Sequence, residues 1–367
     1  MTVGHRAATG AAGAARPAEP LAEPLAELER LADAAMDERA RGYVSTGAGD
    51  EVSLREAGWE HLRFAPYTCV DVSRPDTRTE LVGHRLDHPV LVAPTGCHRL
   101  VHAEGETASA RGAAGTVYCL SEYTTTPMEE VARAAAGPWW VQLNGSVDDA
   151  FTRERLEAAA AHGATAAVVT VDTPVAGLRE RQGWDGVSLP EGLAFGVLDR
   201  APYPVRSPAE PHGVHRPALD ARLTWPRLAA LCASTELPVL VKGVLRGDDA
   251  VRCAEAGADA VIVSNHGARN LDSVVRTSDA LPRVVAALDG RIPVLVDGAI
   301  RRGGDVVKAL ALGARAVLVG RPVLWGLAVD GADGVRRMLQ RLRYELEMTM
   351  ALCGTPRLAD IDAGLLA

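Results

Sequence analysis

Eight short apolar runs recur along the chain from residue 90 onward, and stretches of helical period separate each run from the next. The runs span residues 90–93, 116–120, 139–143, 166–171, 239–241, 260–263, 294–296 and 316–319. Runs of this length that are rich in Val are typical of strands buried on both faces. Eight strand–helix units in series predict an α/β fold, the closed (β/α)8 TIM barrel. An open doubly wound sheet is the alternative, but no Gly-x-Gly-x-x-Gly follows the first run.

The segment before the first run predicts a helical extension of the barrel. Residues 21–40 carry Leu and Ala at helical spacing and are expected to form an amphipathic helix. A glycine-rich turn over 42–51, which contains Tyr43, and a second helical patch over 54–64 follow it. We therefore expect an N-terminal helical extension that precedes the barrel.

The sequence predicts one domain, preceded by a disordered terminus and interrupted by one long loop. Residues 1–20 are rich in Ala, Gly and Pro and are expected to be disordered. Residues 21–367 are expected to form a single (β/α)8 barrel domain. After the fourth run, residues 183–220 show little periodicity, and a loop of that length predicts a lid or an insertion.

Charge, cysteine spacing and the lengths of the apolar runs argue against nucleic-acid binding, a metal site and a membrane span. The formal net charge of −8 argues against a nucleic-acid-binding surface and favours a small-molecule role. The six cysteines include no Cys-x-x-Cys pair, so free thiols are expected and a metal site is not. No apolar run approaches the length of about 18 residues that spans a bilayer, and residues 1–20 lack the apolar core of a signal peptide. We expect a cytoplasmic protein without a membrane partner.

Polar residues follow every predicted strand. In a barrel all strands run the same way, so these residues are expected to converge on one face, where barrel enzymes place their chemistry. One polar residue at a strand end is unremarkable, but eight such ends are not expected by chance. The residues are Pro94, Thr95, Gly96, Ser121, Gln142, Thr170, Asp172, Lys242, His266, Arg269, Asp297, Gly320 and Arg321.

The last two strand ends predict a phosphate site. Asp297 and Gly298 lead into Arg301, and Gly320 precedes Arg321, so glycine-rich turns open helices beside two arginines. Free backbone N–H groups at helix starts, together with arginines, favour an anion. Phosphate is usually bound after strands seven and eight of such barrels. The alternative is that these are tight turns with surface arginines.

A second sub-site is predicted around His266. Asp172 can fix the tautomer of the imidazole and stabilise its protonated form, which makes His266 a better base. Arg179 and Arg269 offer paired donors that match a substrate carboxylate. Lys242 either holds a developing anion or serves as a Schiff-base lysine.

Several motifs together resemble the FMN-dependent α-hydroxy acid oxidase and dehydrogenase family, which includes glycolate oxidase, lactate oxidase and mandelate dehydrogenase. The resemblance covers residues 43–354, nearly the whole chain that we expect to be ordered. It is carried by Asn265-His266-Gly267-Ala268-Arg269-x-Leu271-Asp272, Thr170-Val171-Asp172-Thr173-Pro174, Lys242-Gly243, Arg301-Arg302-Gly303, Lys308-Ala309-Leu310-Ala311-Leu312-Gly313-Ala314 and Gly320-Arg321-Pro322.

The resemblance implies FMN as cofactor and a role for each residue. His266 would be the base with Asp172 behind it, while Arg179 and Arg269 clamp the substrate carboxylate and Tyr43 adds a hydroxyl contact. The substrate's α-hydrogen would leave as hydride or after carbanion formation, and both routes stay open. The family also implies a homo-oligomer, a tetramer. Residues implied to bind FMN are Pro94, Thr95 and Gly96 at the ring, Ser121, Gln142 and Thr170 at its edges, Lys242 at N1 and O2, Ser264, and Asp297, Gly298, Arg301, Gly320 and Arg321 toward the phosphate.

Departures from the family pattern fall in the substrate pocket. Asn144 stands where the family has a Tyr that contacts the substrate, and Tyr123 replaces a Trp. Residues 181–184 lose the family's Asp-x-Arg-Asn pattern, and Ala299 replaces a Gly. We therefore predict FMN-dependent oxidation of a bulkier (S)-2-hydroxy acid, aryl or biosynthetic, with dioxygen as acceptor. The alternatives are a dehydrogenase, a monooxygenase that decarboxylates oxidatively, another FMN barrel reaction such as an isomerase, and a non-catalytic flavin-binding barrel.

Overall fold

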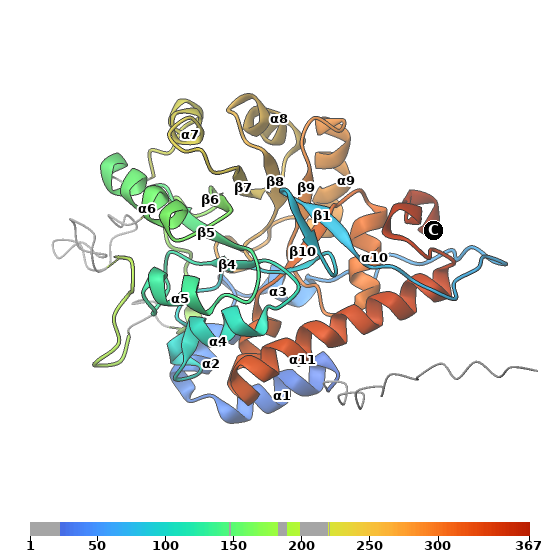
Figure 1. The fold of residues 1–367 in the computed structure, drawn as a ribbon, viewed down its shortest axis with the longest axis horizontal. Helices are drawn as coiled ribbons and strands as arrows, with labels where there is room; N and C mark the ends of the chain where they lie inside the picture. Colours follow the sequence, from blue (N-terminus) through green and yellow to red (C-terminus); the bar gives the residue numbers. More distant parts are fainter. Residues whose placement is uncertain (1–22, 147, 183–188, 199–218, 220) are drawn as a thin grey trace, which may run out of the picture.

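The computed structural model describes residues 23–146, 148–182, 189–198, 219 and 221–367. Its centre is a closed barrel of eight parallel strands in the order β10-β3-β4-β5-β6-β7-β8-β9 (Figure 1). The predicted (β/α)8 TIM barrel is confirmed, and each strand overlaps one predicted run. The strands are β3 (Val90–Val92), β4 (Tyr118–Leu120), β5 (Trp139–Asn144), β6 (Ala166–Thr170), β7 (Val239–Val244), β8 (Ala260–Val263), β9 (Val294–Val296) and β10 (Ala316–Val319).

The strands bury both faces, which is why they read as continuous apolar runs. Alternate residues such as Leu91, Trp140 and Ile262 form one buried cluster inside the barrel. The residues between them belong to a second cluster shared with the surrounding helices. This alternation of period two has a consequence for the site, because it places Gln142 and Asn144 on the same side of β5 as Trp140.

One end of the barrel is closed by a hairpin that the apolar pattern did not indicate. Strands β1 (Thr79–Leu81) and β2 (His84–Leu86) pair antiparallel and lead directly into β3. Leu81 and Leu86 pack into the cluster inside the barrel, at its amino-terminal end. The hairpin thus covers the amino-terminal end of the barrel, and the opposite, carboxyl-terminal end is where barrel enzymes bind their ligands.

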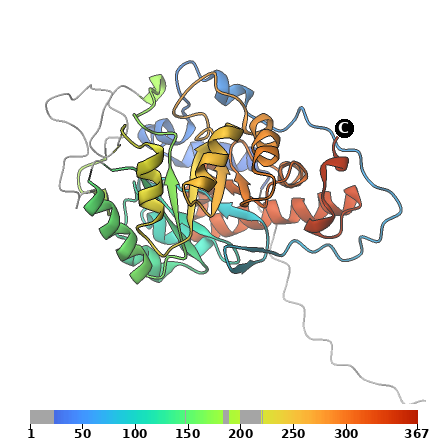
Figure 2. The same ribbon diagram turned by 90° about the horizontal axis from the view of Figure 1, so that it is seen from above.

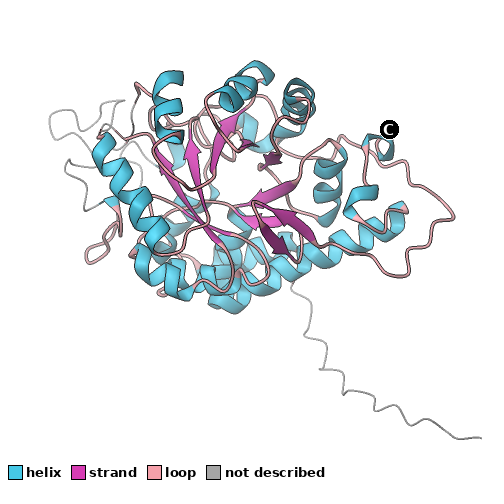
Figure 3. Cartoon of the chain, turned by 45° about the horizontal axis from the view of Figure 1, so that its top comes forward, coloured by secondary structure: helices cyan, strands magenta, loops and turns pink. Residues whose placement is uncertain are grey.

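The barrel is enclosed by helices, which Figure 3 shows in cyan around the magenta strands. The last of them, α11, is broken by a kink at Asp330 and Gly331, where Gly331 adopts a φ of 52°. Gly320 immediately precedes α11 at the end of β10. The barrel helices are α4 (Gly105–Gly112), α5 (Met128–Ala134), α6 (Asp149–Ala161), α7 (Trp225–Cys232), α8 (Gly247–Glu255), α9 (Thr277–Leu288), α10 (Gly303–Ala311) and α11 (Arg321–Cys353).

The N-terminal extension is helical, as predicted, but its boundaries differ. The helix expected over 21–40 is two helices, α1 (Leu25–Ala35) and α2 (Glu38–Ser45). The break arises because Asp37 caps α2, accepting a bond from the Ala40 N–H at 2.7 Å. Tyr43 consequently lies inside α2 rather than in the glycine-rich turn. Figure 1 shows α1 lying along α11.

The second helical patch is also shorter than expected. Helix α3 (Val52–Glu56) spans five residues, and the chain from there to Phe64 is not helical. Farther along, the segment around Tyr67 loops out beside the C-terminus (Figure 2) and bonds to it, with the Tyr67 N–H donating to the Cys353 carbonyl at 3.0 Å. The C-terminal segment therefore anchors an otherwise irregular loop.

Two predictions fall wholly or largely outside the described residues. These are the disorder of residues 1–20 and the lid over 183–220, of which only 189–198 and 219 are described. Within the described part of the chain, no helix is both long and apolar enough to cross a membrane. The cysteines there are free.

Candidate active site

A cavity of about 540 Å³ lies at the carboxyl ends of the barrel strands, a size typical of cofactor and substrate sites. Every predicted site residue except Asp172 and Ser264 lines it. Asp172 and Ser264 lie directly behind the lining and bond to residues in it. The structure thus brings together residues that are up to 278 positions apart in the chain, from Tyr43 to Arg321.

His266 and Asp172 form the predicted pair. Nδ1 of His266 lies 2.9 Å from Oδ1 of Asp172. Burial acts to raise the pKa of Asp172, but the charge and hydrogen bond of His266, together with Lys242, outweigh it and hold the pKa below its usual value. Asp172 is therefore ionised at neutral pH, and it favours the tautomer of His266 in which Nε2 is free to accept a proton.

The turn that carries His266 has an unusual backbone. Three successive residues adopt left-handed conformations, with φ of 55° at His266, 62° at Gly267 and 61° at Ala268. Such conformations cost about 1–3 kcal/mol at a non-glycine residue and persist where surrounding contacts hold them. Here Ser264 Oγ accepts the His266 N–H at 3.0 Å, and Ala48 N–H donates to the Ala268 carbonyl at 2.8 Å.

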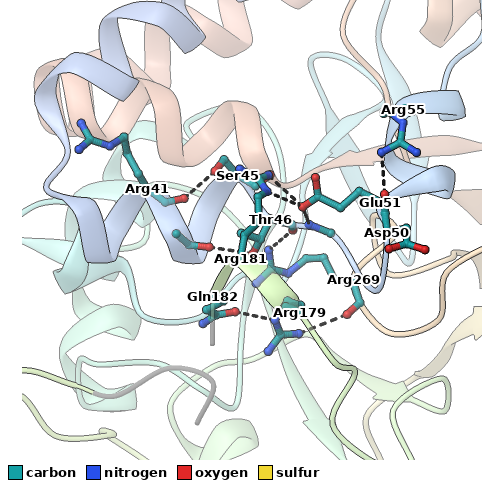
Figure 4. A network of polar contacts seen from close by, with 12 residues as sticks. Arg41, Ser45, Thr46, Asp50, Glu51, Arg55, Arg179, Arg181, Gln182 and Arg269 are labelled. Carbon is teal, nitrogen blue, oxygen red and sulfur yellow. Dashed lines mark hydrogen bonds and ion pairs between the residues drawn. The ribbon is translucent and has the colours of Figure 1, made fainter. Parts of the chain in front are cut away.

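Arg179 and Arg269 lie together in the lining of the cavity. Figure 4 shows Arg179 between Gln182, which accepts from its Nε at 2.6 Å, and the backbone carbonyl of Arg269, 3.3 Å from its Nη1. Burial, and then repulsion from Arg269, lowers the pKa of Arg179 to about 10. Among the described residues, neither arginine has a carboxylate within ion-pair distance. Two desolvated cations in one cavity favour an anionic ligand.

Tyr43 reaches the cavity from α2 and packs against Arg269. The Arg269 Cζ atom lies 5.1 Å from the centre of the Tyr43 ring. Burial raises the pKa of Tyr43 well above its usual value, so its hydroxyl is a neutral hydrogen-bonding group. Cys97 lines the cavity beside it, and burial raises the pKa of that thiol to about 12. A thiol of such a high pKa is unreactive at neutral pH.

Lys242 is held as a cation at the floor of the cavity. Its Nζ donates to Ser264 Oγ at 2.8 Å and lies 3.0 Å from Oδ2 of Asp297. Burial acts to lower the pKa of Lys242, but Asp297 and Asp172 outweigh it and raise the pKa above its usual value. A Schiff-base lysine needs a neutral amine. The geometry therefore favours the alternative in which Lys242 stabilises negative charge.

The predicted phosphate end also carries positive charge. Arg301 and Arg321 both line the cavity, and burial, followed by repulsion from Arg269 and Arg301, lowers the pKa of Arg321 to about 9. Gly298, with a φ of 100°, leaves no room for a side chain, because a Cβ there would lie 2.7 Å from Thr277 Oγ1. Gly320 lies at the start of α11, where backbone N–H groups favour an anion.

The donors and acceptors of the cavity fit FMN. Cations and helix N–H groups at one end suit a phosphate, and neutral amide and hydroxyl groups suit the edges of a flavin ring. Gln142 Nε2 donates to Thr170 Oγ1 at 2.9 Å, and both line the cavity. Oδ1 of Asp297, a residue of the lining, is buried without a partner among the described residues. Such an acceptor suits the hydroxyl groups of a ribityl chain.

Sequence reasoning missed several residues of the site. Asn270 donates from Nδ2 to the Asp172 carbonyl at 2.9 Å and to Thr173 Oγ1 at 2.7 Å, so it restrains the residue that pairs with His266. The sequence signal that could have indicated Asn270 is its position directly after Arg269, in the turn that follows β8. Gln182, which orients Arg179, lies in the segment that departs from the family pattern. Phe195 had no signal, because it lies in the long interval without periodicity.

An aromatic wall bounds part of the cavity. The rings of Tyr123 and Phe195 meet edge to face, with centroids 5.7 Å apart and planes at 79°. The Gly196 N–H donates to the Thr124 carbonyl at 2.8 Å, which docks this segment on the loop after β4. Leu219 also lines the cavity. This wall is therefore largely apolar, whereas Arg179 and Arg269 make another part of the cavity positively charged.

Comparisons with known proteins identify the family of the chain. The sequence profile of the family described as FMN-dependent dehydrogenase matches residues 32–367. An L-lactate oxidase of Nostoc sp. is 43% identical over 93% of this chain and 97% of its own length. Glycolate oxidase 3 of Oryza sativa subsp. indica is 41% identical over 92% of this chain and 94% of its own length.

Solved structures of mandelate oxidase have the same fold. The structure with (S)-2-phenylpropionate superposes with a TM-score of 0.84 at 38% identity, and covers 94% of this chain and 97% of that one. The structure with benzoyl-formic acid has a TM-score of 0.84 at 37% identity, with coverage of 94% and 97%. The chain therefore belongs to the FMN-dependent dehydrogenase family, has FMN as its cofactor, and is an FMN-dependent 2-hydroxy acid oxidase.

Proposed function

We propose that the enzyme oxidises an (S)-2-hydroxy acid bulkier than glycolate or lactate to the 2-oxo acid, with dioxygen as the electron acceptor and hydrogen peroxide as the second product. This proposal rests on one arrangement in the cavity. A single base and two arginines, neither of which has an anionic partner among the described residues, lie beside an aromatic wall. His266 with Asp172 supplies the base, and Arg179 with Arg269 supplies the carboxylate site. The reaction balances, since the substrate loses two electrons and two protons and dioxygen gains them.

The residues act as follows in this proposal. Arg179 and Arg269 bind the carboxylate and so orient the carbinol carbon. Nε2 of His266 takes a proton from the substrate, and the Asp172 carboxylate stabilises the imidazolium that results. Bound FMN supplies the acceptor for the two electrons. Lys242 stabilises the negative charge that develops at the floor of the cavity.

The cofactor-binding residues are those predicted from the strand ends. Pro94, Thr95 and Gly96 follow β3 and would lie along the ring, and Ser121, Gln142 and Thr170 would bond its edges. Lys242 and Ser264 are already bonded to each other. Asp297, Gly298, Arg301, Gly320 and Arg321 would take the ribityl and phosphate groups. Their common position around one cavity supports this assignment.

The preference for a bulky substrate rests on the walls of the cavity. Tyr123 and Phe195 form an apolar surface, and Asn144 is smaller than the family's Tyr at that position. Solved mandelate oxidase structures hold (S)-mandelic acid and benzoyl-formic acid, both of which carry a phenyl group. An aryl 2-hydroxy acid satisfies both the apolar wall and the arginine pair.

The proposal is tested by mixing the yellow purified protein anaerobically with glycolate, (S)-lactate and (S)-mandelate. We expect mandelate to bleach the flavin absorbance with the highest kcat/KM. In air, one peroxide should form for each 2-oxo acid. A higher kcat/KM for glycolate or lactate would contradict the proposed preference for a bulky substrate. A carboxylic acid one carbon shorter, formed with carbon dioxide, would instead indicate a monooxygenase. Failure of all three acids would contradict the proposed activity on this substrate class.

A further inference from the structure

A buried acid lies directly behind Asn144 in the cavity wall. The side chain of Glu122 is 1% exposed and pairs with Arg155 of α6, whose side chain is 6% exposed. Oε2 of Glu122 accepts two bonds from Asn144, one from the backbone N–H at 2.6 Å and one from Nδ2 at 2.9 Å. Glu122 stands between two cavity residues in sequence, yet its carboxylate is directed at β5 and α6.

This contact determines how the Asn144 amide is turned. An ionised carboxylate can only accept hydrogen bonds, so the Asn144 atom that faces Glu122 must be Nδ2. The amide oxygen, Oδ1, therefore faces the other way. Its protein donor is Gln142 Nε2 at 3.4 Å, a long contact, and that same nitrogen makes a shorter bond to Thr170 Oγ1 at 2.9 Å. Since Asn144 lines the cavity, Oδ1 is available to a ligand there.

The position of Oδ1 also indicates which part of a substrate it meets. Gln142 and Thr170 are the residues that would bond the edge of the flavin, so Asn144 stands beside the reacting centre rather than at the outer rim of the cavity. A group on the carbon next to the carbinol carbon would reach it. A buried acceptor left without a donor lowers affinity, so a ligand that lacks the donor binds less tightly than a ligand of the same shape that carries it.

We propose that the Glu122–Arg155 pair fixes the Asn144 amide with Oδ1 toward the cavity, and that this oxygen selects 2-hydroxy acids that carry a hydrogen-bond donor on carbon 3. This rests on the proposed function for the substrate's carboxylate and carbinol. Asn144 is then the specificity-determining residue, and Glu122 and Arg155 are positioning residues. The buried pair is suited to that role, because neither member can be lost alone without leaving a buried charge.

The test uses ligands that cannot be oxidised at carbon 2, so it does not depend on turnover. The probes are 3-phenylpropanoate, 3-hydroxy-3-phenylpropanoate and 3-methoxy-3-phenylpropanoate, and their Kd values are measured on the FMN-loaded protein from the change in visible flavin absorbance. We expect the hydroxy acid to bind at least about tenfold tighter than either of the others. Equal binding of the hydroxy and methoxy acids would overturn the proposal, because only the hydroxyl can donate.

Variants separate selection from folding. Asn144→Leu keeps the shape but removes the amide, and should bring the three Kd values within about threefold of one another, a smaller ratio than the roughly tenfold one expected for the wild type. Glu122→Leu with Arg155→Leu replaces the buried pair by apolar groups, a change that folds tolerate. The double variant should lose the same discrimination, and adding Asn144→Leu to it should have no further effect. Retained discrimination in the folded double variant would overturn the positioning role.

A matched control removes a different acid–arginine pair. Asp149 lies on α6 and pairs with Arg227 at 2.5 Å, away from the cavity. Asp149→Asn with Arg227→Met should leave the three Kd values and their ratios unchanged. If the three probes are discriminated as expected but no 2-hydroxy acid bleaches the enzyme, the proposed function fails while the role of Asn144 stands. If a 2-hydroxy acid bleaches the enzyme but the three probes bind equally, the role of Asn144 fails while the proposed function stands.

Discussion

At the scale of single residues, the proposed mechanism depends on His266 and Asp172, which come from different strand ends and meet at 2.9 Å. Asn270 and Thr173 bond around Asp172 and restrict its movement. The left-handed backbone of His266 shows that the turn is held against its local preference. The imidazole of His266 is therefore held in place before a ligand binds. The negative charge of Asp172 beside it is the feature that a substitution can test.

Asp172→Asn should slow the anaerobic bleaching of the flavin by roughly 10²–10⁴-fold, because the amide cannot stabilise the imidazolium. FMN binding should be retained, since Asp172 does not line the cavity. Stopped-flow absorbance measures the rate. Thr173→Val is the control, because its hydroxyl lies 3.2 Å from Asp172 and carries no charge, and the loss should stay below about tenfold. An unchanged rate in Asp172→Asn would exclude Asp172 from catalysis.

The same carboxylate predicts a pH dependence of stability. The folded-state pKa of Asp172 is lowered, whereas its value in the unfolded chain is about 3.9. A depressed folded pKa contributes stability above the unfolded value, and that contribution is lost as the pH falls through the folded value. The difference in unfolding free energy between the wild type and Asp172→Asn should therefore be present at neutral pH and shrink below about pH 3.9. Urea titrations across this range would show a constant difference if the assignment were wrong.

At the scale of elements, the carboxyl end of α2 is bound by three arginines. The last carbonyls of a helix lack partners within it and favour cations. Here the Tyr43 and Thr46 carbonyls accept from Arg269, Val44 and Thr46 accept from Arg321, and Ser45 accepts from Arg181. Figure 4 shows Arg181 between Ser45 and Glu51. This contact set places Tyr43 in the cavity and links it to Arg269, at the proposed carboxylate end, and through the Val44 and Thr46 carbonyls to Arg321, at the proposed phosphate end.

Arg181→Ala should loosen α2 and raise the KM for the 2-hydroxy acid. Arg181 is about half exposed and pairs with Glu51 at 2.9 Å, so the loss of stability should be at most about 1 kcal/mol. We expect KM to rise by roughly threefold to tenfold while the Kd of FMN is unchanged, because Tyr43 is displaced but the phosphate end is not. Arg55→Ala is the control, since Arg55 donates to the Asp50 carbonyl on the neighbouring exposed segment. A rise in the Kd of FMN instead of KM would contradict this assignment.

At the scale of the whole molecule, the barrel concentrates buried charge around one cavity. Burial lowers the pKa values of Arg269, Arg301 and Arg321, and repulsion from the other two arginines lowers that of Arg321 further. Lys242 differs, because Asp297 and Asp172 raise its pKa, and it alone of the four cations has an acidic partner within ion-pair distance among the described residues. An anionic cofactor offsets this repulsion. FMN is therefore expected to stabilise the fold as well as to serve the reaction.

Removal of FMN should lower the thermal midpoint, and its return should raise it with concentration. At a free concentration of 100 Kd, a ligand that binds only the folded state contributes about 2.7 kcal/mol. Circular dichroism melts across an FMN series measure the effect. Riboflavin, which lacks the phosphate, should stabilise less because it does not engage Arg301 and Arg321. Equal stabilisation by riboflavin would place the phosphate elsewhere.

Assembly is a second property of the whole molecule. We predict a homo-oligomer, because Tyr344, Met348 and Leu352 lie one turn apart on α11 and are all exposed, Leu352 to 72%. A row of exposed apolar residues is typical of a protein interface. Leu352→Glu should reduce the mass measured by light scattering, whereas Val329→Glu, at an isolated exposed residue, should not. A monomeric wild type would contradict the prediction.

The fold and most of the site follow from local sequence patterns. Val-rich runs of strand length indicate strands that are buried on both faces. Because the strands of the barrel are parallel, the residues that follow them lie at the same end of the barrel. The same rule places His266, Lys242 and Asp297 together without knowledge of any contact. The sequence could not indicate the break at Asp37 that puts Tyr43 in α2, because a capping residue also reads as one polar position of a continuous helix.

Contacts between distant segments were decided only by the tertiary structure. The pairing of His266 with Asp172 spans 94 positions and that of Arg269 with Tyr43 spans 226. The Phe195 wall and the Glu122–Arg155 pair behind Asn144 likewise depend on how loops pack over the strand ends. Periodicity reports only which face a residue takes, whereas substrate choice depends on distances and amide orientations that form when the whole barrel closes.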